Sequence, residues 1–184
     1  MRGERDRRIE IRLAGSGGQG IGLAGLLLAE AAVLAGRNAA QSQVYGPESR
    51  GGASRSDVVI ADGEIGFPKA GRLDALVALT QEAAERYCPD LRRGGLLLVD
   101  ERRVPRPPVG EWECRSLPIE GTARSVGSVV AANLVALGAL LGVTGLLEPE
   151  ALERAVSARV SARHRDLNVR ALAAGRRLAD GVDG

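Results

Sequence analysis

The chain has 184 residues, a formal net charge of +2, and 45% hydrophobic and 26% charged residues, which is the composition of a folded domain. So small a charge, with four aromatic residues in all, argues against a nucleic-acid-binding protein. One histidine and two cysteines without a CxxC pair exclude a multi-histidine metal site and a four-cysteine cluster held by this chain alone.

The N-terminal half begins with the pattern of a doubly wound α/β unit. Residues 9–14 alternate in polarity and then become apolar, which predicts a strand. A glycine-rich run at residues 15–20 follows, and the almost wholly apolar residues 21–34 predict a helix that ends before Gly36. Strand, glycine turn and helix in this order predict a Rossmann-like start.

The central part predicts more strands and one short helix. We expect strands at residues 38–44 and 56–61, joined by a loop at 45–55. The pair Asp62-Gly63 predicts a hairpin turn with a short returning strand at residues 64–66.

Two apolar runs then predict the middle of the sheet. Residues 74–79 predict a buried strand, and Thr80 is expected to cap a helix that begins at Gln81. The continuous apolar run 96–100, which ends in Asp100, is typical of a central strand buried on both faces.

The last third is predicted to be helical, after a proline-rich loop at residues 101–110 and an edge strand at 111–117. Residues 125–147 carry no charge and are long enough to cross a bilayer in principle. Their serine, asparagine and glycine content favours a buried helix, either central in its domain or covered by a partner chain. Further helices are expected at residues 148–160 and 168–180.

These elements predict one domain over residues 1–184. Its expected fold class is α/β, a three-layer α/β/α arrangement with a mainly parallel or mixed sheet, a Rossmann-like start and a helical C-terminal part. The charged N-terminus is not followed by the apolar run of a signal peptide, so we expect a cytoplasmic protein with reduced cysteines.

The glycine-rich turn is the first candidate binding site. Gly15, Gly17 and Gly20 form a GxGxxG pattern, completed by Gly18 and Gln19, where backbone N–H groups can approach an anion at a helix N-terminus. A dinucleotide site also needs an acidic residue about 20 residues further on, and that region has none. A nicotinamide site is therefore disfavoured, while another ligand and a ligand-free packing turn both stay open.

The loop after the second predicted strand is the second candidate site. Loops of this length between strands are usually functional or disordered. Its candidate residues are Tyr45, Gly46, Pro47, Glu48, Arg50, Gly51 and Gly52. In a doubly wound sheet both candidate loops leave the carboxyl ends of strands, so we expect them to share one face.

No catalytic residue and no metal ligand is predicted. His164 stands between two arginines and is interpreted as part of a solvated helix end or loop. Cys88 is interpreted as structural, and no two carboxylates have a spacing that suggests acid–base catalysis.

The two glycine-containing motifs, in this order and spacing, resemble the gamma subunit of the 2-oxoacid:ferredoxin oxidoreductases. The resemblance covers nearly the whole chain, through residues 54–58, 67–69, 74–83, 94–95 and 133–138 to Asn168. It is closest to the 2-oxoglutarate branch, with the pyruvate and ketoisovalerate gamma subunits next. It implies a complex that oxidatively decarboxylates a 2-oxoacid with coenzyme A to an acyl-CoA and CO2, and reduces ferredoxin.

The resemblance also implies a division of labour. No cofactor is expected on this chain alone, because thiamine diphosphate, Mg, the iron–sulfur clusters and coenzyme A belong to a complex with alpha, beta and ferredoxin-like delta parts. The two candidate loops would line the coenzyme A or thiamine diphosphate region, with no role for nucleic acid or membrane. The alternative is a stand-alone nucleotide- or coenzyme-binding module that uses residues 15–20.

Overall fold

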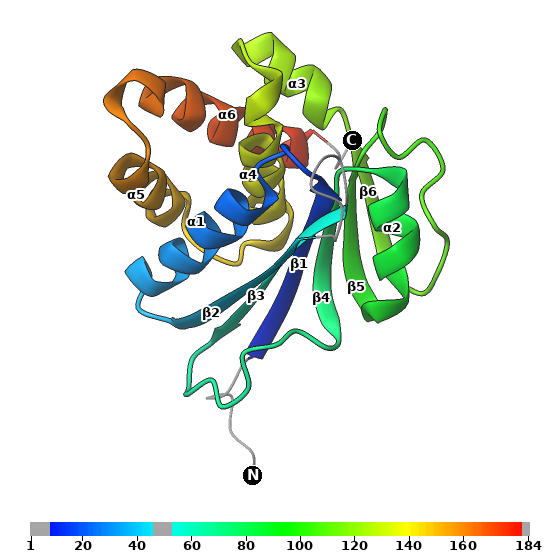
Figure 1. Ribbon diagram of the computed structural model, residues 1–184. Coiled ribbons are helices and arrows are strands. Elements are labelled where there is room, and N and C mark those ends of the chain that lie inside the picture. Colours follow the sequence, from blue (N-terminus) through cyan, green and yellow to red (C-terminus); the bar gives the residue numbers. More distant parts are fainter. Residues whose placement is uncertain (1–7, 46–52, 182–184) are drawn as a thin grey trace.

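A mixed six-stranded sheet runs through the computed structural model, which describes residues 8–45 and 53–181 (Figure 1). The strands are β1 (Arg8–Ser16), β2 (Asn38–Tyr45), β3 (Ala53–Ala61), β4 (Leu73–Ala78), β5 (Leu91–Asp100) and β6 (Glu113–Leu117). Their order in the sheet is β2-β3-β1-β4-β5-β6, and β3 is antiparallel to both of its neighbours. The other neighbouring strands are parallel, which confirms the α/β class and a mixed sheet.

Helices cover the two faces of the sheet unequally. They are α1 (Ile21–Leu34), α2 (Gln81–Tyr87), α3 (Ile119–Val126), α4 (Ala132–Thr144), α5 (Pro149–Arg159) and α6 (Ala162–Asp180), with 3-10 turns at Cys88–Asp90 and Val129–Ala131. α1 and α3 to α6 pack on one face, and α2 packs on the other (Figure 1). The three expected layers are therefore present, and within residues 8–45 and 53–181 one of them has a single short α-helix.

The alternation of side chains along each strand builds these two cores. Ile11 and Leu13 of β1 point into the large helical core, whereas Ala14 points toward α2. β5 contributes Leu98 to the first core and Leu97 to the second. Burial on both faces explains why this strand is a continuous apolar run, as the sequence predicted for a central strand.

The predicted hairpin at Asp62-Gly63 is wrong. Residues 64–66 form no strand, because β3 already pairs with β2 on one side and with β1 on the other. Side chains of β1 bind the segment instead: Arg8 donates to the carbonyl oxygen of Phe67 at 2.9 Å, and Glu10 accepts from the N–H of Gly71 at 2.6 Å. The chain thus passes along the amino end of β1 on its way to β4.

Several predicted boundaries also shift. The connection between β2 and β3 is shorter than expected, because β2 extends through Tyr45 and β3 already starts at Ala53. β5 starts at Leu91 and α6 at Ala162, ahead of the apolar runs that predicted them. The added residues are mostly polar and exposed, so no hydrophobic pattern marked them.

The long uncharged segment does not form one helix. α3 ends at Val126, Gly127 adopts a left-handed φ of 115°, and α4 begins at Ala132. Within the described ranges, every helix is too short or too polar to cross a membrane. α4 is buried from Asn133 to Leu141, so the buried-helix interpretation is confirmed for this part of the segment.

Two glycines allow α4 and α6 to pack backbone against backbone. A Cβ atom on Gly138 would lie 2.1 Å from the carbonyl oxygen of Leu172, and one on Gly175 would lie 1.9 Å from that of Val135. Real Cβ atoms do not come so close to backbone, so any side chain here would push the helices apart.

Gly175→Ala is therefore expected to lower the free energy of unfolding by about 2 kcal/mol, although alanine is the better helix former by about 1 kcal/mol. The matched control is Gly66→Ala, because a Cβ atom there meets nothing within 4 Å. Urea unfolding of both variants measures the difference. Equal effects would contradict close packing of these helices.

Candidate functional site

The carboxyl ends of β1 and β4 form a topological switch point in the sheet. The two strands are parallel neighbours, but the chain leaves them in opposite directions: from β1 through α1 toward β2, and from β4 through α2 toward β5. In open α/β sheets, such a point leaves a crevice in which ligands bind. The glycine-rich turn of residues 15–20 lies here.

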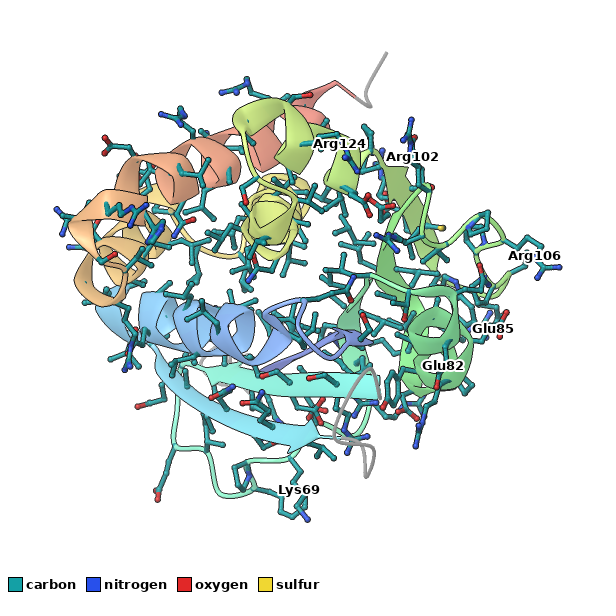
Figure 2. The ribbon with its side chains drawn as sticks, turned by 45° about the horizontal axis from the view of Figure 1, so that its top comes forward. Lys69, Glu82, Glu85, Arg102, Arg106 and Arg124 are labelled. Atoms are coloured by element: carbon teal, nitrogen blue, oxygen red, sulfur yellow. The ribbon has the colours of Figure 1, made fainter. Side chains whose placement is uncertain are left out.

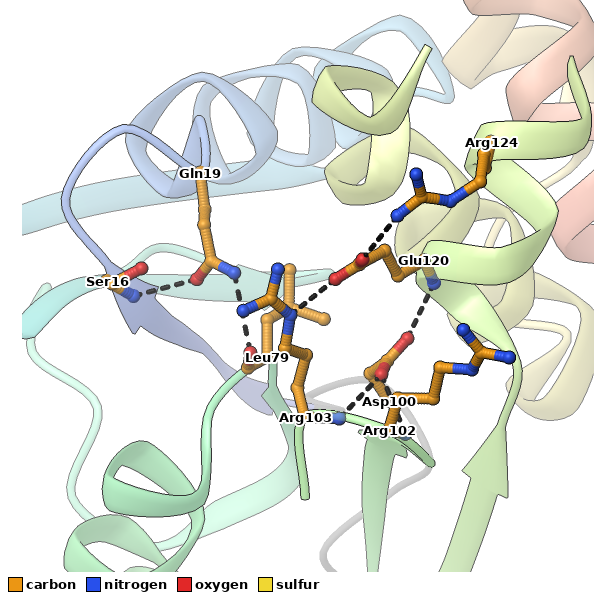
Figure 3. A network of polar contacts seen from close by, with 8 residues as sticks. All are labelled: Ser16, Gln19, Leu79, Asp100, Arg102, Arg103, Glu120 and Arg124. Atoms are coloured by element: carbon orange, nitrogen blue, oxygen red, sulfur yellow. Dashed lines mark hydrogen bonds and ion pairs between the residues drawn. The ribbon is translucent and has the colours of Figure 1, made fainter. Parts of the chain in front are cut away.

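The side chain of Gln19 forms hydrogen bonds inside the turn (Figure 3). Its Oε1 accepts the backbone N–H of Ser16 at 2.7 Å, and its Nε2 donates to the carbonyl oxygen of Leu79 at 3.4 Å. Gln19 thus connects the ends of β1 and β4. A Cβ atom on Gly15 would lie 2.2 Å from Gln19 Oε1, so glycine at position 15 makes room for this side chain.

Gly20 is fixed by a second contact. It caps α1 with a left-handed φ of 69°, which favours glycine. Nδ2 of Asn133, at the start of α4, donates to its carbonyl oxygen at 3.1 Å, and a Cβ atom on Gly20 would lie 2.4 Å from that nitrogen. Close packing therefore explains why glycine stands at positions 15 and 20. Gly17 and Gly18, by contrast, are exposed on the outside of the turn.

The sheet register brings the second candidate loop to the same edge. Tyr45 pairs with Ser54, and Ser54 pairs in turn with Gly15. The points at which the loop leaves β2 and enters β3 therefore lie beside the glycine turn, as the sequence predicted. The candidate residues Gly46, Pro47, Glu48, Arg50, Gly51 and Gly52 lie outside the described residues, as does the side chain of Tyr45.

Asp100 organises a polar network farther along this edge, which the sequence analysis missed. It ends β5, is 1% exposed, and accepts the backbone N–H groups of Arg102, Arg103 and Glu120 at 2.9, 2.8 and 2.5 Å (Figure 3). Asp100 thereby holds both the turn after β5 and the start of α3. An acidic residue at the end of a buried apolar strand was the signal available in the sequence.

Glu120 extends the network to two arginines. Its carboxylate pairs with Arg103 and, at 3.0 Å, with Arg124, and its side chain is 14% exposed. The hydrogen bond from Arg103 lowers the pKa of Glu120 below its ordinary value of 4.5, against the opposing effect of burial. Arg124 belongs to α3 and Arg102 follows β5 (Figure 2), so Glu120 lies at an arginine-rich edge that favours its ionised form.

A buried ion pair lies on the α2 face of the sheet and was also missed. Nε and Nη2 of Arg12 donate to the two carboxylate oxygens of Asp57 at 2.6 and 3.0 Å, and Nη1 donates to Asp90. Arg12 is 2% and Asp57 4% exposed. Burial alone would lower the pKa of Arg12, but the hydrogen bonds and charges of the two aspartates raise it above its ordinary value.

The remaining reactive residues fit the structural interpretations. His164 is exposed in the first turn of α6, with Nδ1 3.2 Å from Ser161 Oγ, so it is part of a solvated helix end. Cys88 is 2% exposed, and burial raises its pKa to about 12, which keeps the thiol protonated. Among residues 8–45 and 53–181, no three His, Cys, Asp or Glu side chains group in a way that could hold a metal ion.

Comparison with known proteins identifies the family. The family model for pyruvate ferredoxin/flavodoxin oxidoreductase matches residues 10–178. The chain belongs to this family. It is 44% identical over 179 residues to the 2-oxoglutarate synthase subunit KorC of Methanothermobacter thermautotrophicus, covering 93% of this chain and 95% of that relative.

Two further relatives refine the comparison. The ketoisovalerate oxidoreductase subunit VorA of the same organism is 37% identical over 91% of this chain, but only 35% of that longer protein is matched. The solved keto/oxoacid ferredoxin oxidoreductase gamma subunit from Geobacter sulfurreducens is 46% identical, with a TM-score of 0.88 over 95% of this chain and 98% of that one. The resemblance to the gamma subunits, and to their 2-oxoglutarate branch, is confirmed.

Glu120→Gln is expected to flatten the acid side of the stability profile. Because the pKa of Glu120 is lowered in the folded protein, its ionisation stabilises the fold above pH 4.5, and this stabilisation disappears as the pH falls through the lower folded pKa. At pH 7 we expect the free energy of unfolding of E120Q to be about 1 kcal/mol below that of the wild type. On acidification, the free energy of unfolding of E120Q should fall less than that of the wild type.

Urea unfolding at a series of pH values measures this effect. Glu113→Gln is the control, because that side chain is 53% exposed and carries a single ion pair on the edge strand. Wild-type and E120Q profiles that run parallel between pH 7 and about pH 3 would contradict a stabilising role for the ionised carboxylate.

Proposed function

We propose that this chain is the noncatalytic gamma subunit of a 2-oxoglutarate:ferredoxin oxidoreductase. The complex would decarboxylate 2-oxoglutarate oxidatively, transfer the acyl group to coenzyme A and pass two electrons to ferredoxin. The observation that carries this proposal is the identity of 44% to KorC over nearly the full length of both chains, against 37% to the ketoisovalerate relative.

The chemistry of the described residues supports an accessory role. Asp100 accepts backbone N–H groups and Glu120 pairs with arginines, so neither of these two acidic groups is poised as a catalytic base. Two cysteines cannot supply the four thiolates of a cluster, and burial raises the pKa of the Cys88 thiol. Thiamine diphosphate, Mg and the iron–sulfur clusters would therefore be held by alpha, beta and delta subunits, in the cytoplasm.

This subunit would contribute a surface beside the coenzyme A or thiamine diphosphate region. We assign that role to Gly15, Gly17, Gly18, Gln19 and Gly20 together with residues 45–52. Exposure of Gly17 and Gly18 leaves backbone open to a neighbour, while Gln19 fills the turn behind them. The first turn of α1 holds no acidic side chain, so the positive end of that helix keeps its attraction for an anion.

The alternative function is a stand-alone nucleotide- or coenzyme-binding module. The Ser16 N–H is already taken by Gln19, and β2 contains no acidic residue that could bind a ribose. Calorimetry of the isolated chain with NAD, NADP, FAD and coenzyme A separates the two functions. Micromolar binding of a nucleotide by the chain alone would favour the alternative.

Co-expression with the alpha and beta subunits tests the proposed function. We expect a stable complex that turns over 2-oxoglutarate faster than pyruvate, whereas the purified chain shows neither thiamine diphosphate binding nor turnover. Native affinity purification followed by mass spectrometry identifies what accompanies the chain. A chain that purifies without these subunits would contradict the proposal.

A further inference from the structure

A cluster on the α2 face of the sheet gathers three arginines around one aromatic ring. The guanidinium carbons of Arg12, Arg55 and Arg86 lie 4.9, 5.7 and 5.5 Å from the ring centroid of Tyr87, which is 7% exposed. The arginines come from β1, β3 and the last turn of α2. The faces of aromatic rings attract such cations, so Tyr87 holds them close together despite their like charge.

The two carboxylates of this cluster are both committed to Arg12. Asp57 binds it through two hydrogen bonds, and Asp90 through one. Within the described ranges Arg55 and Arg86 form no ion pair, and Nε of Arg55 is buried without a hydrogen-bond partner. Leaving such a donor unpaired costs about 1–3 kcal/mol. Among the described residues, three guanidinium charges at this ring thus face two carboxylate charges.

The position of Arg55 connects this cluster to the candidate site. Arg55 pairs across the sheet with Ala14 on one side and with Val44 on the other. It is one residue from Ser54, which marks the carboxyl edge beside the glycine turn. The cluster therefore adjoins that edge from the α2 face, whereas α1 approaches it from the opposite face.

We propose that Arg55 and Arg86 bind an oxyanion, a phosphate or a carboxylate, against the ring of Tyr87. The planar guanidinium of Arg55 presents a fork of N–H donors that matches two oxygens of such a group. Asp57 and Asp90 both pair with Arg12, which leaves Arg55 and Arg86 for a further anion. The proposal rests on these contacts and does not depend on the proposed function. The anion belongs either to a small ligand or to an acidic side chain of a partner subunit.

Calorimetry of the full-length chain with inorganic phosphate, pyrophosphate, coenzyme A and 2-oxoglutarate tests the small-ligand source. Arg55→Met is expected to weaken binding of the tightest of these anions about ten-fold or more, as loss of a charge-assisted hydrogen bond predicts. Arg55→Lys, which keeps the charge but loses the fork, should fall between. Arg86→Met is the second variant, in case Arg55→Met does not fold, because Arg86 is exposed. It should weaken binding of the same anion.

The control is Arg159→Met, which removes the same charge from the opposite side of the molecule, where Arg159 pairs with Glu30. The partner source is tested in the co-expressed complex. If the isolated chain binds none of the anions, Arg55→Met should reduce the amount of partner subunits recovered with the chain, and this reduction should depend on the salt concentration. Arg159→Met should not change the amount recovered.

Identical behaviour of the Arg55, Arg86 and Arg159 variants in both assays would overturn the oxyanion site. That result, in a complex that the wild type forms normally, leaves the gamma-subunit proposal intact. Conversely, Arg55-dependent anion binding by a wild-type chain that recruits no partner subunits would support the oxyanion site and contradict the proposed function.

Discussion

The buried ion pair between Arg12 and Asp57 is the contact on which the sheet most depends. It joins β1 to β3 where both side chains are almost completely buried, and Asp90 adds a contact from the segment after α2. Removal of one partner from such a pair costs roughly 3–5 kcal/mol, because the other charge stays buried. A slip of one residue would send Asp57 to the opposite face of the sheet. The pair therefore fixes the register of β3 and the packing of α2 together.

The arrangement of the carboxyl edge follows from this register. With Arg12 opposite Asp57, Gly15 falls opposite Ser54, and Ser54 opposite Tyr45. The glycine turn and both ends of the β2–β3 connection thus meet at one place, although they are distant in sequence. Gln19 then links the turn to β4 on this edge. The resulting edge is rich in arginines, which suits a subunit that presents a surface to other chains.

Sequence predicted the features that local signals encode. Thr80 caps α2 by accepting the backbone N–H of Ala83 at its Oγ1, as its position before the helix indicated. The place of β3 in the sheet could not be predicted, because Asp62-Gly63 gives a strong local turn signal while the true partners of β3 lie earlier in the chain. The role of Arg12 was hidden for a similar reason. A polar residue in an alternating strand predicts a solvated face, and its burial depends on Asp57 and on α2.

Hydrogen–deuterium exchange tests most directly the claim that the carboxyl edge of the sheet faces the partner subunits. Exchange is compared between the isolated chain and its complex with the alpha and beta subunits. If this edge faces the partner subunits, exchange in residues 15–20 slows on assembly, because the exposed Gly17 and Gly18 become covered. Exchange in residues 62–72, which lie by the amino end of β1, should stay unchanged. Exchange that slows in residues 62–72 but not in residues 15–20 would contradict a carboxyl edge that faces the partner subunits.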